Sequence, residues 1–522
     1  MLKRLSLYVH TLRFLKPIQL YYRCYYVFLK WIGLHKLEDK SLERVQFMRL
    51  TYQITWSNAC YYAENTFSFL NTKHTFIDKI DWEFMTYGKL WQYNLAYFDY
   101  LNQPSLTKEE GLRLMRDFIA QKHSLQAAID PYPTSLRIIN WIKFISKHRI
   151  QEQALTDTLY AQALFLSKRI EYHLLGNHLL ENAFALLHAG VFFQEERFYT
   201  KATKIIRTEL QEQLLADGGH FEGSPMYHQL LLYRVLEAVD LLRNNQQDSD
   251  LERLLTSKAS AMLGWLQAIS FSNGHIPMVN DATLGIAPDT AMLEEMGHLL
   301  NIQPTPQVLS NSAYRMFKRQ HFEVLIDVGG IAPNYQPGHA HADTFNLLLY
   351  VDNRPILVDT GISTYQVSNR RQVERSTSSH NTVTVNDKNQ SEVWGGFRVA
   401  RRAVVELLED TPSGMTALHD GYLADGVLHE RSLRVNENGF IVLDSLVGSD
   451  VEGIVHWHFD AEVVWQLKDN QVCFQGGSLL FEGHESIEQS SYLLAKGFNQ
   501  LVVASKIKVT FKQSVKTTFL HS

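Results

Sequence analysis

The chain has 522 residues, more than one hydrophobic core usually organises, so its length predicts roughly two to four domains. Hydrophobic residues at 45% and charged residues at 20% exclude a disordered chain, and the formal net charge of −5 argues against a general nucleic-acid binder. The three cysteines, Cys24, Cys60 and Cys473, form neither a disulfide framework nor a CxxC metal motif. This cysteine usage fits a reducing compartment.

The first segment, residues 1–40, is basic and rich in tyrosine. It lacks the uninterrupted apolar run and the small-residue cleavage site of a signal peptide. The chain has no run of about eighteen uncharged apolar residues, so no membrane span is expected. We therefore expect a cytoplasmic protein. Its first segment has two interpretations: a basic amphipathic helix on a membrane surface, or an ordinary first helix packed on its neighbours.

Residues 41–305 are predicted to be helical. Apolar residues recur there at helical spacing, and Gly, Pro, Asp or Asn punctuates the joins. The segments with this spacing are 155–175, 179–193, 199–215, 227–242 and 251–269. Successive antiparallel helix pairs are the economical packing for such a run.

Beyond the linker-like stretch 303–306 the sequence changes to short β-branched runs, many of them bounded by turn residues. These runs are 322–327, 344–351, 356–358, 382–385, 403–407, 433–435, 441–446, 454–459 and 501–508. The pattern is typical of an antiparallel sandwich. We therefore predict an α+β multidomain chain: an N-terminal segment (1–40), a helical domain (41–305) and an all-β domain (306–522). Ligand sites favour the interface between such domains.

The first candidate site opens a helix at Gly176. His178 and Glu181 are i,i+3 neighbours there, and Asn177 and Glu181 are i,i+4 neighbours, so the three side chains can share one face. The alternative interpretation is that Asn177 is a plain helix N-cap.

The second candidate is the glycine-rich stretch 217–228, which carries His220, Glu222 and Tyr227 ahead of a helix. The partial positive charge at a helix N-terminus favours the phenolate of Tyr227 over the phenol. An ordinary interhelical loop with a packed tyrosine is the alternative.

The third candidate is the segment 338–343, where His339 and His341 lie two residues apart. In an extended strand such residues point to the same face and could serve one site, whereas a bend there would let them serve two adjacent sites. Histidine suits both proton transfer and metal binding. Asp359 and His380 follow on neighbouring predicted strands, so a Zn²⁺ site is one interpretation. Separately satisfied polar residues are the other.

Further candidates combine aromatic side chains with amide or guanidinium donors, as a sugar cleft does. They are Trp91, Tyr93, Asn94, Arg137 and Asn140. Arg375 and Arg398 belong to a basic group near the β motifs, with guanidinium forks suited to carboxylate or sulfate. Core packing and a solvated charged face are the alternatives.

Together these motifs resemble the heparinase II/III-like family of polysaccharide lyases. The similarity extends from about Leu90 to about Trp457, and its strongest parts are 176–182, 223–227, 338–343, 358–361 and 379–382. The resemblance implies an incomplete (α/α) toroid followed by a C-terminal antiparallel β-sandwich. It also implies cleavage of uronic-acid polysaccharides or oligosaccharides by β-elimination, and a bound divalent metal, usually zinc.

The resemblance also implies residue roles. Asn177 and His178 would neutralise the uronate carboxylate, with Glu181 orienting His178. Tyr227 would act as general base, general acid or both, and His339 would be the second proton-transfer group. His341, Asp359 and His380 would hold a structural metal, and His220, Glu222 and the cleft residues named above would bind substrate.

Two alternatives remain open at this point. A glycoside hydrolase would need two facing carboxylates, for which Glu181, Glu222 and Asp281 are available. A non-catalytic glycan-binding or assembly factor for a cell-surface polysaccharide would keep the cleft but tolerate loss of Tyr227 or His339. The lyase interpretation accounts for Tyr227 and His339 together and is preferred.

Overall fold

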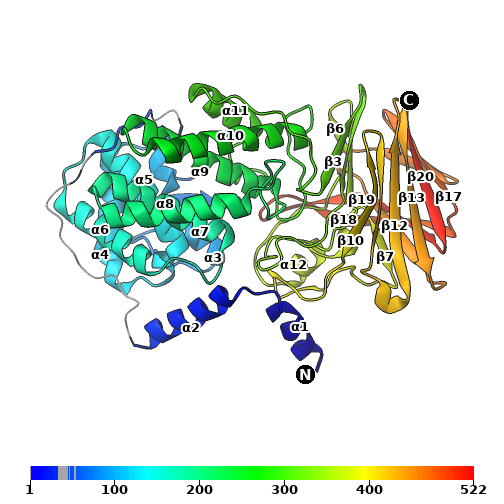
Figure 1. Cartoon of the computed structure of the whole chain (residues 1–522), viewed down its shortest axis with the longest axis horizontal. Helices are drawn as coiled ribbons and strands as arrows, with labels where there is room; N and C mark the ends of the chain where they lie inside the picture. Colours follow the sequence, from blue (N-terminus) through cyan, green and yellow to red (C-terminus); the bar gives the residue numbers. More distant parts are fainter. Residues whose placement is uncertain (1, 33–44, 46, 52–53) are drawn as a thin grey trace.

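A computed structural model describes residues 2–32, 45, 47–51 and 54–522. It has a helical half and a half built of antiparallel sheets, side by side along the long axis (Figure 1). The prediction of an α+β chain is thus confirmed. The predicted boundary between residues 40 and 41 lies outside the described residues.

Two helices, α1 (Leu2–Leu12) and α2 (Pro17–Trp31), form the N-terminal segment and lie along one side of the molecule (Figure 1). A hairpin of β1 (Thr66–Phe69) and β2 (Thr72–Thr75) follows, where only helices were predicted. Its turn residues Leu70 and Asn71 both have positive φ, the geometry of a tight two-residue hairpin turn.

The helical half is a set of packed helices around one large apolar core. The five predicted helical segments are confirmed as α6 to α10, because their apolar residues face that core at helical spacing. No described helix is long and apolar enough to cross a bilayer. The helices are α3 (Lys89–Tyr97), α4 (Lys108–Gln121), α5 (Pro131–His148), α6 (Gln153–Lys168), α7 (Gly176–Phe193), α8 (Glu196–Gln213), α9 (Pro225–Asn244), α10 (Ser249–Ile269) and α11 (Thr290–Leu299).

The β half contains an eight-stranded sheet (β10-β11-β12-β13-β20-β17-β16-β15), two four-stranded sheets (β18-β19-β14-β7 and β3-β4-β5-β6) and a β8-β9 ribbon. Strands occur at all nine predicted runs. The elements are β3 (Tyr314–Lys318), β4 (Phe322–Asp327), β5 (Leu347–Val351), β6 (Arg354–Leu357), α12 (Asn369–Glu374), β7 (Val383–Val385), β8 (Val393–Trp394), β9 (Arg398–Val399), β10 (Val405–Thr411), β11 (Gly414–His419), β12 (Val427–Val435), β13 (Gly439–Gly448), β14 (Gly453–His458), β15 (Trp465–Lys468), β16 (Gln471–Phe474), β17 (Gly477–Glu482), β18 (Ser486–Gly497), β19 (Gln500–Phe511) and β20 (Ser514–His521).

A small apolar cluster joins the two halves. Trp265 and Ile269 of α10 pack there with strand residues of β3 to β5. Phe271, just beyond α10, stacks on Tyr350 of β5 with ring centroids 3.7 Å apart. This contact fixes the loops that follow α10 against the β half, and those loops carry part of the candidate site.

Candidate active site between the two halves

A cavity of about 630 Å³ opens between the helical half and the β half. Helices α3, α5, α7 and α9 line one side of it, and loops of the β half line the other. Its aromatic lining comes from both sides and includes Tyr93, Tyr97, Tyr132, Tyr227, Tyr365 and Phe397. Ring faces of this kind suit stacking against sugar rings.

The start of α7 places Asn177 and His178 in the cavity lining. Leu175 and Gly176 both have positive φ, and a Cβ on Gly176 would lie 2.0 Å from the Gln336 side chain. Only glycine therefore fits this turn. The backbone N–H of Asn177 donates to Glu222 Oε1 at 3.1 Å, which fixes the first turn of the helix over a buried carboxylate.

His178 contacts Glu171, not Glu181. Its Nδ1 lies 3.2 Å from Glu171 Oε1. Burial alone would lower the pKa of His178, but the Glu171 carboxylate outweighs burial and raises that pKa above its usual value. His178 thus favours the imidazolium form.

The prediction that Glu181 orients His178 is wrong. Glu181 lies one turn further along α7 and accepts a hydrogen bond from Arg234 Nε at 3.0 Å. Arg234 also pairs with Glu237, so Glu181 belongs to a buried ion-pair network between α7 and α9. Glu181 still reaches the cavity lining from that network.

Tyr227 lies in the first turn of α9, where Ser224 caps the helix and Pro225 occupies its first position. Its hydroxyl lies 3.2 Å from the Tyr365 hydroxyl, and its ring lies 4.0 Å from the His339 ring between centroids. Burial, with Tyr365 nearby, raises the pKa of Tyr227 well above its usual value. Desolvation thus acts against the phenolate preference expected from the helix terminus.

The pair Asn280 and Asp281 holds the two sides of the cavity together. Asn280 Nδ2 donates to the carbonyl of Gly223, just before α9, and Asn280 Oδ1 accepts the backbone N–H of His341 at 2.9 Å. The backbone N–H of Asp281 donates to the His339 carbonyl at 3.1 Å. This double attachment brings Tyr227 and His339 together.

Asp281 also orients both histidines of the 338–343 segment. Its two carboxylate oxygens lie 2.9 Å from His339 Nδ1 and 2.9 Å from His341 Nε2. The buried guanidinium of Arg371 pairs with the same carboxylate. Burial would raise the pKa of Asp281, but Arg371 and the two histidine hydrogen bonds hold it well below its usual range. Asp281 is therefore a carboxylate whose charge Arg371 already balances.

The His339 side chain lines the cavity, and its other ring nitrogen, Nε2, lies 3.7 Å from Glu222 Oε2. Neither His339 nor His341 lies in a strand, so they do not share one strand face. Their positions agree with the alternative prediction of two adjacent sites. His339 lines the cavity and His341 is buried behind it. The shared partner Asp281 connects the two.

A buried group of potential metal ligands lies on the far side of His341. Asp343, Asp359 and His380 bring one ligand atom each to within 4.8 Å of one another. His380 Nδ1 lies 2.8 Å from Asp359 Oδ2, whereas His380 Nε2 and Asp343 Oδ2 are buried without a hydrogen-bond partner. Buried polar atoms are nearly always paired, so these two atoms fit a divalent cation.

The predicted third ligand, His341, does not belong to this group, which includes Asp343. His341 uses Nε2 for Asp281. Its Nδ1 is also buried without a partner, and its ring centroid lies 5.4 Å from that of His380. His341 is thus a neighbour of the group.

The predicted cleft residues divide into two sets. Tyr93, Asn94 and Asn140 line the cavity. Six others do not: Trp91, Arg137, His220, Glu222, Arg375 and Arg398.

Most of the second set is buried for structural reasons. Trp91 is a core residue that donates to the carbonyl of Thr72. Arg137 donates to the carbonyls of Ala96 and Ala128 at 2.9 and 2.8 Å, which ties α5 to the segments that flank it.

The remaining members stabilise loops next to the cavity. Arg375 donates to the carbonyl of Ala340. His220 contacts Gln213, and Glu222 lies beneath the site, 3.7 Å from His339 Nε2. Arg398 is exposed and its guanidinium lies over the Trp394 ring. None of these six belongs to the cavity lining. For Trp91 and Arg137, which are fully buried in the helical half, the prediction of substrate contact is wrong.

Sequence reasoning missed Glu171, Tyr132 and Tyr365. It considered Arg371 only as a member of the basic group near the β motifs and Asp281 only as a hydrolase carboxylate. Tyr132 stacks near His178, with ring centroids 4.4 Å apart. The Arg371 guanidinium lies 5.1 Å from the centre of the Tyr365 ring. The local signal for Asp281 was the Asn280-Asp281 dipeptide in the loop between α10 and α11, inside the predicted helical domain.

Two family models cover the region that contains this site. Heparinase II/III N-terminus matches residues 132–310, and the C-terminal heparinase II/III-like model matches residues 302–520. The chain belongs to the heparinase II/III-like family. The family resemblance predicted from the motifs is confirmed.

Relatives of this heparinase II/III-like chain include a heparin-sulfate lyase of Pedobacter heparinus. It is 24% identical over 351 residues, which cover 60% of this chain and 51% of the relative. A heparin-sulfate lyase of Bacteroides thetaiotaomicron is 24% identical over 350 residues, covering 57% and 48%. The chain spans about half the length of the curated relatives it matches.

Solved structures share the fold. A heparan sulfate lyase from Pedobacter heparinus aligns with a TM-score of 0.58 and 17% identity, covering 88% of this chain and 81% of that one. A heparinase III aligns with a TM-score of 0.62 and 17% identity, covering 85% and 79%. At this identity the likeness supports the fold alone.

Proposed function

We propose that this heparinase II/III-like chain is a polysaccharide lyase that cleaves uronic-acid polymers or oligosaccharides by β-elimination. One observation carries the proposal: Tyr227 of the helical half and His339 of the β half meet in one cavity, with ring centroids 4.0 Å apart. Asn177 and His178 line the same cavity. These are the residue types that elimination needs in one place.

Elimination begins with the loss of the C5 proton beside the uronate carboxylate. The negative charge of that carboxylate opposes carbanion formation, so hydrogen bonds and positive charge on it stabilise the developing charge. In the proposed mechanism the amide of Asn177 and the imidazolium of His178 neutralise the carboxylate. The raised pKa of His178 supports this role.

Two further residues then move protons. Because His339 Nδ1 lies 2.9 Å from the Asp281 carboxylate, we assign the proton to Nδ1 and the lone pair to Nε2, which lies 3.7 Å from Glu222 Oε2. We assign Nε2 as the base that takes the C5 proton when that hydrogen faces it. The C4–O bond breaks, the C4=C5 double bond forms, and the Tyr227 phenol donates its proton to the leaving oxygen. The raised pKa of Tyr227 keeps that proton available.

A divalent ion, for which we propose zinc, would be held by Asp343, Asp359 and His380, with His341 beside them. It would brace the β half behind His339. We further propose that the helices close into an incomplete (α/α) toroid (41–305) and that the sheets form a β-sandwich (306–522). The helical core, the core between the strands and the family resemblance support this division.

For the substrate we propose a uronic-acid polymer with few or no sulfate groups. Among the described residues lining the cavity, Lys89 and Arg234 are the only Lys or Arg side chains, and each already pairs with carboxylates. Sulfate recognition favours unpaired guanidinium or ammonium groups. The relatives named for heparin sulfate thus differ from this chain in proposed substrate.

The test is ultraviolet absorbance during incubation with unsulfated glucuronate and mannuronate polymers and with sulfated glycosaminoglycans. Elimination creates a conjugated double bond that absorbs. We expect growth of this band on an unsulfated polymer. Tyr227→Phe should lower kcat by about 10²–10⁴-fold. Tyr97→Phe, which removes a hydroxyl elsewhere in the same cavity, is the matched control and should keep most of the activity.

Three outcomes would contradict parts of this proposal. New reducing ends without absorbance would indicate hydrolysis. Binding of a glycan without any cleavage would favour an assembly factor. Faster cleavage of sulfated than of unsulfated polymers would overturn the substrate class while leaving the lyase intact.

A further inference from the structure

The N-terminal helices attach to the body by one face each. In α2, the buried Gln19 donates to the carbonyls of Leu174 and Tyr335, which belong to the helical half and the β half. Tyr22 of α2 packs on Tyr172, with ring centroids 4.7 Å apart. In α1, Tyr8 packs edge-on against Trp394. Both helices are therefore anchored and cannot turn their outer faces inward.

The outer faces of both helices are apolar. In α2, Leu20, Val27 and Trp31 share one face at positions i, i+7 and i+11, and Val27 and Trp31 are 70% and 82% exposed. In α1, Leu5, Val9 and Leu12 share a face at i, i+4 and i+7, and all three are exposed. Soluble surfaces rarely group large apolar side chains in this way without a partner.

The charges beside these faces have one sign. Arg4 and Arg13 flank the α1 face, Arg23 and Lys30 flank the α2 face, and all four are exposed. No Asp or Glu precedes Glu38 in the sequence. Exposed cations beside an apolar face are the pattern of a helix that lies in the headgroup region of an anionic bilayer.

We propose that α1 and α2 form a membrane-docking surface that binds anionic phospholipid bilayers peripherally. Both helices lie on the same side of the molecule, so one flat surface can contact both (Figure 1). A second copy of the chain fits less well, because a two-fold interface built on these helices would bring their cations together. The lipid headgroup charge offsets the cations, and the acyl boundary buries Leu20, Val27 and Trp31.

Vesicle co-sedimentation tests this proposal with phosphatidylcholine vesicles, with and without about a third phosphatidylglycerol. We expect the full chain to bind the anionic vesicles, and high salt to weaken binding. The double variant Val27→Asp/Trp31→Asp should lower the affinity at least ten-fold. Ile77→Asp, which places the same charge at a fully exposed apolar position on the body, is the matched control and should bind like the wild type.

Two results would overturn the proposal. One is equal sedimentation of the wild type and the double variant. The other is a wild type that does not bind vesicles and is dimeric by light scattering, with a monomeric Val27→Asp/Trp31→Asp variant. The apolar faces of α1 and α2 would then contact a second copy of the chain. The double variant should still cleave a soluble polymer, because the outer faces of α1 and α2 lie outside the cavity. Lost vesicle binding with retained cleavage therefore tests membrane docking separately from the proposed lyase activity.

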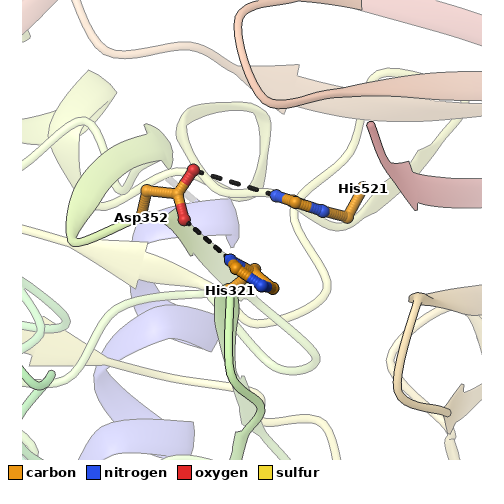
Figure 2. A group of neighbouring side chains, drawn as sticks. All are labelled: His321, Asp352 and His521. Atoms are coloured by element: carbon orange, nitrogen blue, oxygen red, sulfur yellow. Dashed lines mark hydrogen bonds and ion pairs between the residues drawn. The ribbon is translucent and has the colours of Figure 1, made fainter.

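A second, independent group of side chains meets on the surface of the β half (Figure 2). His321 precedes β4, Asp352 lies in the β5–β6 turn, and His521 ends β20. His321 Nδ1 lies 3.2 Å from Asp352 Oδ1, and His521 Nε2 lies 3.8 Å from Asp352 Oδ2. One ligand atom from each residue lies within 4.8 Å of the others.

The backbone places the first two residues. The N–H of Asp352 donates to the carbonyl of His321 at 2.8 Å, so these side chains leave neighbouring positions of the β3–β6 sheet. His521 comes from the eight-stranded sheet. We infer that the three bind a divalent transition-metal ion such as Zn²⁺, since two imidazoles and one carboxylate form a common ligand set with room for water. The ion would link two sheets.

Zinc content after equilibrium dialysis tests this site. We expect His321→Ala/His521→Ala to bind one zinc ion fewer per chain than the wild type, and zinc to raise the Tm of the wild type more than that of the variant. His298→Ala, which removes an exposed histidine of α11, is the control and should leave the content unchanged. Equal zinc content and equal Tm shifts in wild type and double variant would overturn the inference.

Discussion

Two His–Asp–Arg clusters of similar geometry lie in different places among the described residues. At the cavity, Asp281 joins His339 Nδ1 at 2.9 Å and Arg371. In the β half, Asp444 joins His429 Nε2 at 2.8 Å and Arg431 Nε at 2.7 Å. Both carboxylates and both guanidinium groups are fully buried.

The two clusters differ in the second ring nitrogen of the histidine. In His429 that nitrogen lies 3.1 Å from His419, and the ring is fully buried. In His339 that nitrogen lies 3.7 Å from Glu222 Oε2, beyond hydrogen-bond distance, and the side chain lines the cavity and is 12% exposed. The constellation itself therefore does not identify a catalytic group. A ring nitrogen that remains available to a ligand does.

Removing each carboxylate should give the largest effect and separate the two roles. Asp281→Asn and Asp444→Asn should each lower the free energy of unfolding by about 3–5 kcal/mol, because each leaves a buried guanidinium unpaired. Urea denaturation measures this loss. Only Asp281→Asn should also lower the kcat of the folded enzyme, by roughly 10²-fold or more, because His339 loses its orientation.

Equal loss of kcat in the two variants would mean that activity follows stability alone. An available second ring nitrogen would then not distinguish a catalytic cluster from a structural one. Unchanged kcat in Asp281→Asn would remove His339 from the proposed mechanism.

A third histidine, His178, should make the activity depend on pH. Glu171 raises the pKa of His178, so activity that needs the imidazolium should fall as the pH rises through that value. Glu171→Gln should move this fall to lower pH and reduce kcat/KM at neutral pH by roughly ten-fold, less than the loss of a full donor. A pH profile of kcat/KM measures the shift. Asp130→Asn, which removes another carboxylate of the cavity lining, should not move it.

The same pair affects stability with a defined sign. A raised pKa in the folded state means that the pair stabilises the protein fully below the ordinary histidine pKa of about 6.5. That stabilisation is lost as the pH rises through the folded-state pKa. His178 is partly exposed, so solvent screens the pair and the effect on unfolding is small. An unchanged profile in Glu171→Gln would show that His178 does not act as a cation.

The smallest expected effect concerns Tyr365, whose hydroxyl lies 3.2 Å from that of Tyr227. Tyr365→Phe removes one hydrogen-bond partner of the proposed acid but leaves its proton. We expect kcat to fall by about ten-fold or less, against about 10²–10⁴-fold for Tyr227→Phe. Steady-state kinetics on the same polymer compares them. A loss in Tyr365→Phe equal to that in Tyr227→Phe would make Tyr365 the better candidate for the acid.

Sequence reasoning succeeded where the signal is local. Helical spacing located α6 to α10, and β-branched runs located nine strand regions, because burial of one face imposes a short period on the sequence. The motifs also named Tyr227 and His339, which the fold brings together. The same reasoning failed for Trp91 and Arg137, because aromatic and guanidinium groups in a helix have the same spacing whether they line a cleft or fill a core.

The sequence by itself therefore determined the order of a helical half and a β half, the family and several residues that reach the cavity. Only the tertiary structure decided the partners of those residues. Glu171, not Glu181, holds His178, and Asp281, 58 positions away in sequence, holds His339. The physical reason is that a hydrogen bond depends on separation in space, and separations set by packing two halves of the chain leave no periodic trace in the sequence.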